Sequence, residues 1–235
     1  MSVSHSLLRL AGLYCLILGP MFGQDPQSAT SFHWGDAIIQ SAGFLALEHG
    51  VRIAAESDTR AGLKGPFVRG HLKSVGSLHG WGDGDPFLVN YVGHPAQGAV
   101  SGYIQVQNDP RYRRVEFGSS RDYWKSRLRA LAWSAAYSTQ FEIGLISEAS
   151  LGNAQSSPGH SGVVDLVVTP MGGLAVMIAE DALDRFVVRR FENWTQRRLL
   201  RVLVRGLLNP NRALANMLRG QVPWSRDNRP DVTVP

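Results

Sequence analysis

The chain of 235 residues has a single cysteine, Cys15, which excludes an intramolecular disulfide and any zinc site built on paired cysteines. Charged residues make up 18% of the chain and hydrophobic residues 44%, which is typical of a folded protein and excludes a disordered one. The sequence also lacks the His-Glu-x-x-His motif of zinc hydrolases, the Glu-x-x-His pairs of di-iron bundles and the Gly-x-Ser-x-Gly nucleophile elbow. We therefore expect no cofactor, assign no metal ligands, and find no motif that names a reaction.

Long uninterrupted apolar runs are also missing, and the N-terminus carries a short one. After Arg9, an apolar run extends from Leu10 to Leu18 and is broken by Gly19-Pro20. A bilayer span takes about 20 residues, so this run is too short and matches the hydrophobic region of a secretory signal peptide. We expect residues 1–23 to be a signal peptide and the protein to be exported; an uncleaved amphipathic anchor is the alternative.

The rest of the chain shows helical periodicity and little strand alternation, which predicts an all-α bundle of four to six helices in residues 34–191. Residues 192–220 are expected to form a basic helical arm and residues 221–235 a disordered tail. Two apolar stretches, Phe87–Asn108 and Leu166–Ala179, are interpreted as buried core helices. The helices are expected over residues 35–53, 85–107 with a break at Pro95, 121–152, 161–191 with a kink at Pro170, 194–208 and 212–218, and residues 54–84 as a long loop with at most a short helix.

Polar and small residues repeat at spacings of three and four on three of these helices. Such spacings place each set on one helix face, so the helices are expected to meet along a polar seam. The three stripes are Asn90, His94, Gly98, Ser101 and Gln105; Ser134, Ser138 and Glu142; and Asp165, Thr169, Gly172, Val176 and Glu180. The Gly98-x-x-x-Gly102 spacing further predicts the close approach of a second helix.

His94, Glu142 and Asp165 are the candidate catalytic residues of this seam. A histidine beside carboxylates can act as an acid/base pair or share a metal ion, and helix bundles support both. The alternative is a buried polar network that fixes the helix register. Further seam candidates are Asn90, Glu148, Thr169 and Glu180. Since Asp165 and Glu180 stand about 22 Å apart on one continuous helix, they cannot share one small site.

Charge is distributed unevenly along the chain. Residues 24–184 hold 12 basic and 16 acidic side chains, whereas residues 185–229 hold eleven arginines and two acidic side chains. The arm alternates arginines with leucines, a pattern that favours an anionic membrane surface or an acidic envelope component, with an envelope protein as a further possible partner. The candidate membrane-surface residues are Arg197, Arg198, Arg201 and Arg205. A solvated helix that packs its leucines on the bundle is the alternative, and nucleic acid is not expected for an exported chain.

The motif series resembles the bacterial domain of unknown function 3943 family over residues 34–191. The matching pieces are, in order, Asn90…His94-Pro95…Gly98, Phe141-Glu142 with Ser147-Glu148, Asp165…Thr169-Pro170…Gly172-Gly173, and Ala179-Glu180. Phe141, Val164 and Ala179 stand where members of that family tend to have Trp, Asn and Gly. The resemblance implies an exported protein of the periplasm or outer membrane of Gram-negative bacteria, and it implies no activity.

Two functions are consistent with these observations. The first is an envelope-associated structural or binding module that lies against a membrane through its arginine-rich arm. The second is a membrane-proximal hydrolase of lipid or envelope substrates in which His94 acts as the base and Glu142 or Asp165 orients it. A solvent-reachable pocket around His94 would favour the hydrolase, and a closed, fully paired network would favour the module.

Overall fold

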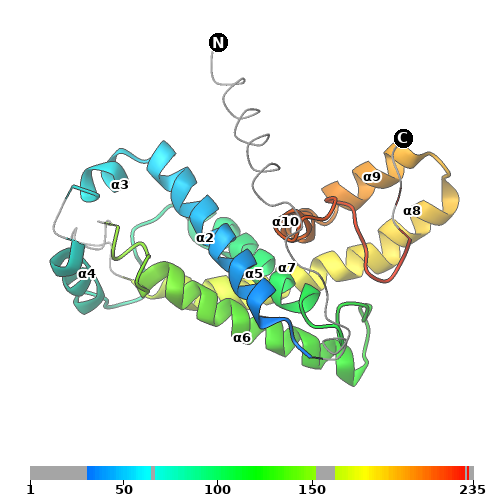
Figure 1. Ribbon diagram of the computed structural model, residues 1–235, viewed down its shortest axis with the longest axis horizontal. Helices are drawn as coiled ribbons and strands as arrows, with labels where there is room; N and C mark the ends of the chain where they lie inside the picture. The colour runs from blue at the N-terminus through cyan, green and yellow to red at the C-terminus, as the bar shows by residue number, and fades with distance from the viewer. Residues whose placement is uncertain (1–30, 65–66, 152–161, 231, 233–235) are drawn as a thin grey trace, which may run out of the picture.

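The computed structural model describes residues 31–64, 67–151, 162–230 and 232 as an all-helical bundle, without a strand among them (Figure 1). The expected signal peptide lies outside these residues. The first elements are α2 (Trp34–Ala55), α3 (Ser57–Gly62), α4 (Phe67–Gly76), the π-helical turn η2 (Val89–Gly93) and α5 (His94–Gln107). They are followed by α6 (Arg121–Ile143), α7 (Val164–Leu183), the π-helical turn η4 (Asp184–Val188), α8 (Arg189–Trp194), α9 (Arg198–Leu207) and α10 (Pro210–Leu218).

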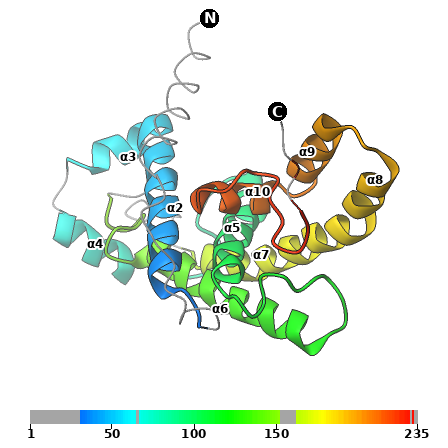
Figure 2. The same ribbon diagram turned by 45° about the vertical axis from the view of Figure 1, so that its right-hand side comes forward.

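Helix α5 is the central element of the bundle. It contacts α2, α6, α7 and α10, and almost every residue from His94 to Gln107 is buried. Because a helix that is surrounded on all sides cannot be amphipathic, α5 combines small, apolar and amide side chains around its whole circumference. Figure 2 shows α5 enclosed by its neighbours, with α3 and α4 at one end of the molecule and α8 and α9 at the other.

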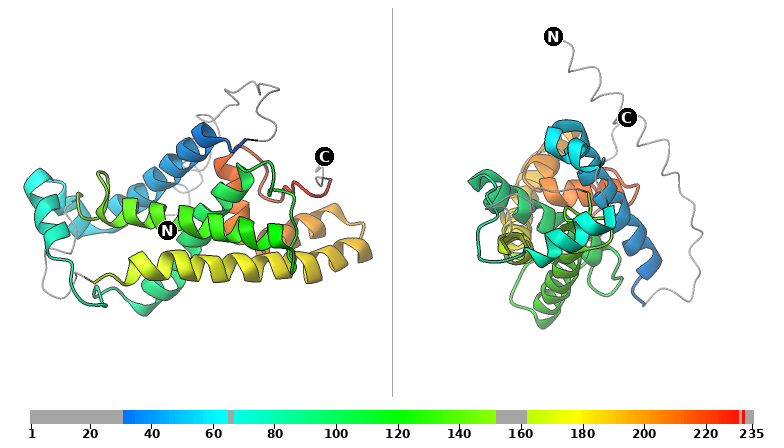
Figure 3. Two further views of the ribbon diagram at one scale, coloured as in Figure 1. Left: turned by 90° about the horizontal axis from the view of Figure 1, so that it is seen from below. Right: turned by 90° about the vertical axis from the view of Figure 1, so that its left-hand side faces the viewer.

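Helix α7 runs without interruption into η4 and α8, so that Val164–Trp194 forms one long rod (Figure 3). This rod is the one candidate among the described residues that is long and apolar enough to cross a membrane, and 33% of its most apolar window is buried. Core helices of soluble bundles pass the same test. Here α7 packs along both α5 and α6.

Local signals explain where α5 and α6 begin. The Ser120 hydroxyl caps α6 by accepting a hydrogen bond from the Tyr123 backbone N–H. Pro95 lies in the first turn of α5, where its missing N–H costs nothing, and the backbone turns through η2 just before it. The expected interruption at Pro95 is therefore a change from π-helical to α-helical winding.

One expected helix boundary and the expected structure of two segments are wrong. Helix α6 ends at Ile143 instead of residue 152, because Gly144 is extended and the chain folds back through bonds from the Glu148 and Ala149 N–H groups. Residues 54–84 contain two helices, α3 and α4. Residues 221–230 are no disordered tail, because Ser225 and Arg226 are buried against the bundle.

Candidate functional site

Helices α5 and α7 cross at backbone contact, and this crossing positions the site. A Cβ added to Gly98 would collide with the Thr169 carbonyl and lie 3.1 Å from the Gly173 Cα. A Cβ added to Gly173 would lie 2.6 Å from the Gly98 Cα. Glycine is thus required on both helices, as the Gly98 spacing predicts for one of them.

His94, Glu142 and Asp165 meet beside this crossing, each from a different helix of the bundle. His94 Nε2 lies 3.5 Å from Asp165 Oδ2, and His94 Nδ1 lies 4.0 Å from Glu142 Oε1. All three residues are buried. Each offers one ligand atom such that the three atoms lie within 4.8 Å of one another. The polar seam expected from the periodicity thus converges on these three side chains.

The imidazole of His94 is held in one orientation by its neighbours. Its Nδ1 lies 3.0 Å from Gln97 Oε1 and 3.1 Å from Thr169 Oγ1. The Gln97 amide is itself fixed, because its Nε2 donates to Glu48 Oε2 at 3.2 Å. The Tyr137 hydroxyl donates to the same Glu48 oxygen at 2.5 Å. This chain of bonds links the site to α2 and α6.

Both carboxyl groups of the cluster have an orphaned oxygen. Glu142 Oε1 and Asp165 Oδ1 are buried and make no hydrogen bond. Burial, followed by the nearby charges of Glu148 and Asp165, raises the pKa of Glu142 well above its ordinary value. Burial, followed by a hydrogen bond and charge repulsion from Asp83, raises the pKa of Asp165 to about 9. Burial also lowers the pKa of His94. Such opposed shifts are typical of functional sites.

The cluster opens into a cavity of about 770 Å³. One part of its wall is apolar, with Phe44, Leu47 and Phe141, and another part is charged. Arg52 on this wall bridges Glu148 at 2.6 Å and Glu56 at 3.2 Å. A volume of this size lies within the range of about 300–1,000 Å³ that small-molecule sites occupy.

The other predicted seam residues divide into two groups. Thr169 contacts His94, Asn90 donates to Asp83 Oδ1 at 2.7 Å, and Glu148 lines the cavity. Glu180 does not join them. Its carboxylate accepts bonds from the Asn211 backbone and side chain at 3.0 and 2.8 Å and so caps the N-terminus of α10, in agreement with the expected distance from Asp165.

Sequence reasoning missed Glu48, Arg52, Asp83 and Gln97 as parts of the site. Gln97 stands three residues after His94, and Glu48 and Arg52 are four apart on one face of α2, so the same spacing rule applies to them. Asp83 belongs to a glycine-rich segment, which composition identifies only as a turn. No local pattern indicates that this turn lies against α7.

The four candidate membrane-surface arginines differ in exposure and in their partners. Arg197 and Arg198 are exposed, and Arg201 is half-buried and donates to the Thr195 carbonyl at 2.7 Å. Arg205 is 3% exposed and forms an ion pair with Glu192. The expectation of a surface role is therefore wrong for Arg205, because it is buried in an ion pair with Glu192, which lies 13 residues earlier in the chain.

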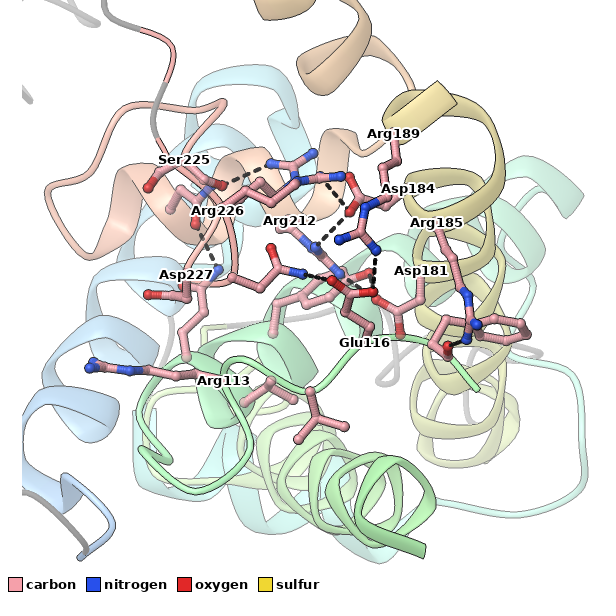
Figure 4. Close-up of a pocket in the computed structure, with 18 of the residues that line it drawn as sticks. Arg113, Glu116, Asp181, Asp184, Arg185, Arg189, Arg212, Ser225, Arg226 and Asp227 are labelled. Atoms are coloured by element: carbon pink, nitrogen blue, oxygen red, sulfur yellow. Dashed lines mark hydrogen bonds and ion pairs between the residues drawn. The ribbon is translucent and has the colours of Figure 1, made fainter. Parts of the chain in front are cut away.

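A second cluster, the C-terminal ion-pair cluster, surrounds a cavity of only about 40 Å³ between α7, α10 and the C-terminal segment. Figure 4 shows Arg212 and Arg226 converging on the carboxylates of Asp181 and Asp184. Because these charges satisfy one another in a cavity of this size, we interpret this cluster as structural. These ion pairs explain why Ser225 and Arg226, beyond the end of α10, are buried against the bundle.

No family model, no curated protein and no solved structure matches this chain. The resemblance to the domain of unknown function 3943 family thus stays a prediction, and the site has to be interpreted from its own geometry.

Proposed function

We propose that this protein is an exported, envelope-associated hydrolase whose reacting groups are His94, Glu142 and Asp165. One observation carries the proposal: an oriented imidazole lies beside two carboxyl groups with unpaired oxygens at the wall of a cavity of about 770 Å³. A purely structural network would pair these oxygens and exclude solvent from them.

The arrangement suits the activation of water. Deprotonation by a positioned imidazole contributes about 10²–10⁴-fold to a hydrolytic rate. In the proposed reaction His94 takes a proton from water as the water oxygen attacks the carbonyl carbon of an ester. The bond to the leaving oxygen then breaks, and that oxygen receives a proton through the neighbouring carboxyl groups. The products are an acid and an alcohol.

The proposed substrate is an amphipathic ester of a lipid or envelope component. The apolar part of the cavity wall supports an acyl chain, and the charged part supports a polar head group. Phe87, Leu88 and Val92 are exposed around η2, whose Val89 lines the cavity, so an apolar surface surrounds this side of the opening. This surface supports docking on a membrane, and Arg197 and Arg198, at the start of α9 near the other end of the molecule, are a separate candidate contact for anionic lipid.

The test is hydrolysis of p-nitrophenyl esters of increasing acyl length by the purified protein. We expect turnover that improves with chain length and falls at least 100-fold in His94→Gln. His79→Gln changes an exposed histidine and serves as the matched control. An enzyme preparation that hydrolyses no ester, or one in which His94→Gln retains full activity, would contradict the proposal. Vesicle flotation with Arg197→Ser/Arg198→Ser tests the contact of these arginines with anionic lipid: undiminished binding to anionic vesicles would remove it.

A ligand-binding module without chemistry is the second candidate, and the size of the cavity and its apolar wall favour it. It predicts that a fatty acid or lysophospholipid raises the thermal midpoint of the protein. It also predicts that His94→Gln leaves this shift unchanged and that no ester is hydrolysed. Val51→Arg, which places a charged side chain on the apolar wall, would then abolish the shift.

A further inference from the structure

We propose that His94, Glu142 and Asp165 bind a divalent transition-metal ion, with Zn²⁺ the best fit. The site itself stands on geometry, whereas the role of the ion in ester hydrolysis rests on the proposed function: in the ion-bound chain the free nitrogen of His94 would be a ligand, so the ion instead of the imidazole would activate the water. Three helices, α5, α6 and α7, each supply one ligand, so the ion would tie the centre of the bundle together.

The hydrogen bonds of His94 determine which ring nitrogen is free. Because Gln97 Nε2 donates to Glu48, the Gln97 oxygen faces His94 Nδ1 at 3.0 Å, and Nδ1 must carry the proton. Nε2 then presents a lone pair toward Asp165 Oδ2 at 3.5 Å. This separation is wider than a normal hydrogen bond, and a cation that displaces the carboxyl proton of Asp165 would fit between the two atoms. A metal-binding histidine fixed through its other N–H is a general feature of such sites.

The carboxyl groups supply the second, independent observation. Glu142 Oε1 and Asp165 Oδ1 have no hydrogen-bond partner, although their side chains are only 6% and 9% exposed. Two ligand atoms at about 2.1 Å from a tetrahedral ion lie about 3.4 Å apart. The separation of 3.5 Å between His94 Nε2 and Asp165 Oδ2 is close to this value, and one ligand atom from each of the three residues lies within 4.8 Å of the others, so small side-chain rotations complete the site.

The donor set and the cavity indicate the kind of metal. One imidazole nitrogen and two carboxylate oxygens suit Zn²⁺ or Mn²⁺ better than Ca²⁺ or Mg²⁺, which prefer oxygen ligands throughout. Three protein ligands leave a coordination position that faces the cavity of about 770 Å³. Catalytic zinc sites share this open position, whereas structural ones are closed by a fourth protein ligand. When bound, such an ion would polarise a water molecule or a substrate carbonyl.

The experiment measures metal content and affinity directly. The full chain is purified, stripped with EDTA, dialysed against Zn²⁺, Mn²⁺ or Mg²⁺ in turn, and analysed by mass spectrometry and titration calorimetry. We expect one Zn²⁺ per chain, weaker Mn²⁺ binding and no Mg²⁺ binding. Affinity for Zn²⁺ should fall at least 100-fold in His94→Ala and Asp165→Asn, and by about 10–100-fold in Gln97→Leu, which removes the orienting bond.

Two controls keep the result interpretable. Glu56→Gln removes a charge from the same cavity wall but leaves the three ligands intact, so its affinity should stay that of the unaltered chain. Co²⁺ binding, followed by its visible absorption in variants shown by circular dichroism to be folded, reports the ligand set without any activity assay. Folded protein that takes up no stoichiometric Zn²⁺, or that binds it equally in Asp165→Asn, overturns the inference. Zinc uptake without ester hydrolysis overturns the proposed function alone, and ester hydrolysis by folded protein that takes up no stoichiometric Zn²⁺ overturns the metal site alone.

Discussion

Asp184 is predicted to contribute strongly to stability, because it is the acidic centre of the C-terminal ion-pair cluster. Its Oδ1 accepts a bond from Arg226 Nε at 2.9 Å and its Oδ2 one from Arg229 Nη2 at 2.6 Å, while Arg212 Nη1 lies 3.8 Å away. Burial alone would raise the pKa of Asp184, but these three arginines outweigh burial and lower it to about 2.

The pH dependence follows from this pKa. A carboxyl group whose pKa is lower in the folded chain than in the unfolded chain stabilises the fold at pH values above its unfolded pKa, which is 3.8 for Asp184. The stabilisation disappears as the pH falls through about 2. At about 1.4 kcal/mol per pKa unit, the contribution of Asp184 near neutral pH is about 2 kcal/mol.

The perturbation is Asp184→Asn. Besides the lost attraction, the variant leaves Arg226 buried without its carboxylate, and breaking a buried pair costs about 3–5 kcal/mol. We expect the free energy of unfolding at pH 7 to fall by about 3 kcal/mol, because Arg226 keeps its bonds to the Ser225 and Arg205 carbonyls. Urea unfolding followed by circular dichroism measures this loss.

Asp227→Asn is the matched control, since it removes an aspartate that pairs with Arg219 in the same segment but is 22% exposed. Such a pair contributes at most about 1 kcal/mol. Equal losses in the two variants, or a loss below 1 kcal/mol in Asp184→Asn, would refute the reasoning that burial and convergence of arginines make Asp184 different.

Two further predictions concern the site and the helix crossing. Burial raises the pKa of Glu48 to about 8, although hydrogen bonds from neighbouring side chains oppose this shift, so the fold should lose stability as the pH rises from 4.5 to about 8. In Glu48→Gln the thermal midpoint should fall less over this pH interval than in the unaltered chain. Equal falls of the thermal midpoint in the two proteins would contradict this pKa of Glu48. Gly98→Ala should destabilise the fold by about 2 kcal/mol or more in urea unfolding, because the new methyl group meets the backbone of α7. Gly50→Ala, in α2 with open space around it, should stabilise the fold by about 0.5–1 kcal/mol, and the same sign in both glycine variants would show that the crossing is not tight.

Sequence periodicity predicted those residues of the candidate site that lie on one face of a long helix. His94, Glu142 and Asp165 belong to stripes with spacings of three and four, and these stripes do meet in the interior. Spacing fails where the partner comes from another element. Nothing near Asp83 in the sequence indicates its contact with Asp165, and nothing near Arg205 indicates its pairing with Glu192.

The wrong helix boundary has the same origin. Apolar residues continue past Gly144 at a spacing that suits a helix, so the pattern predicts that α6 extends to residue 152. The tertiary structure instead folds this segment back, and Ser147 and Ser150 bond each other in the interior. Amphipathic spacing predicts which side chains are buried, but it does not predict whether the chain continues as a helix or folds back to bury them.

The contact between Gly98 and Gly173 has a consequence for how the pocket tolerates change. Main-chain atoms, which no substitution at other positions alters, hold α5 against α7 and therefore set how far the ring of His94 stands from the carboxyl group of Asp165. Phe44 and Leu47 of the surrounding wall belong instead to α2. The fold thus separates the His94–Asp165 pair, whose spacing is set by main-chain contact, from a cavity lining that α2 supplies in part.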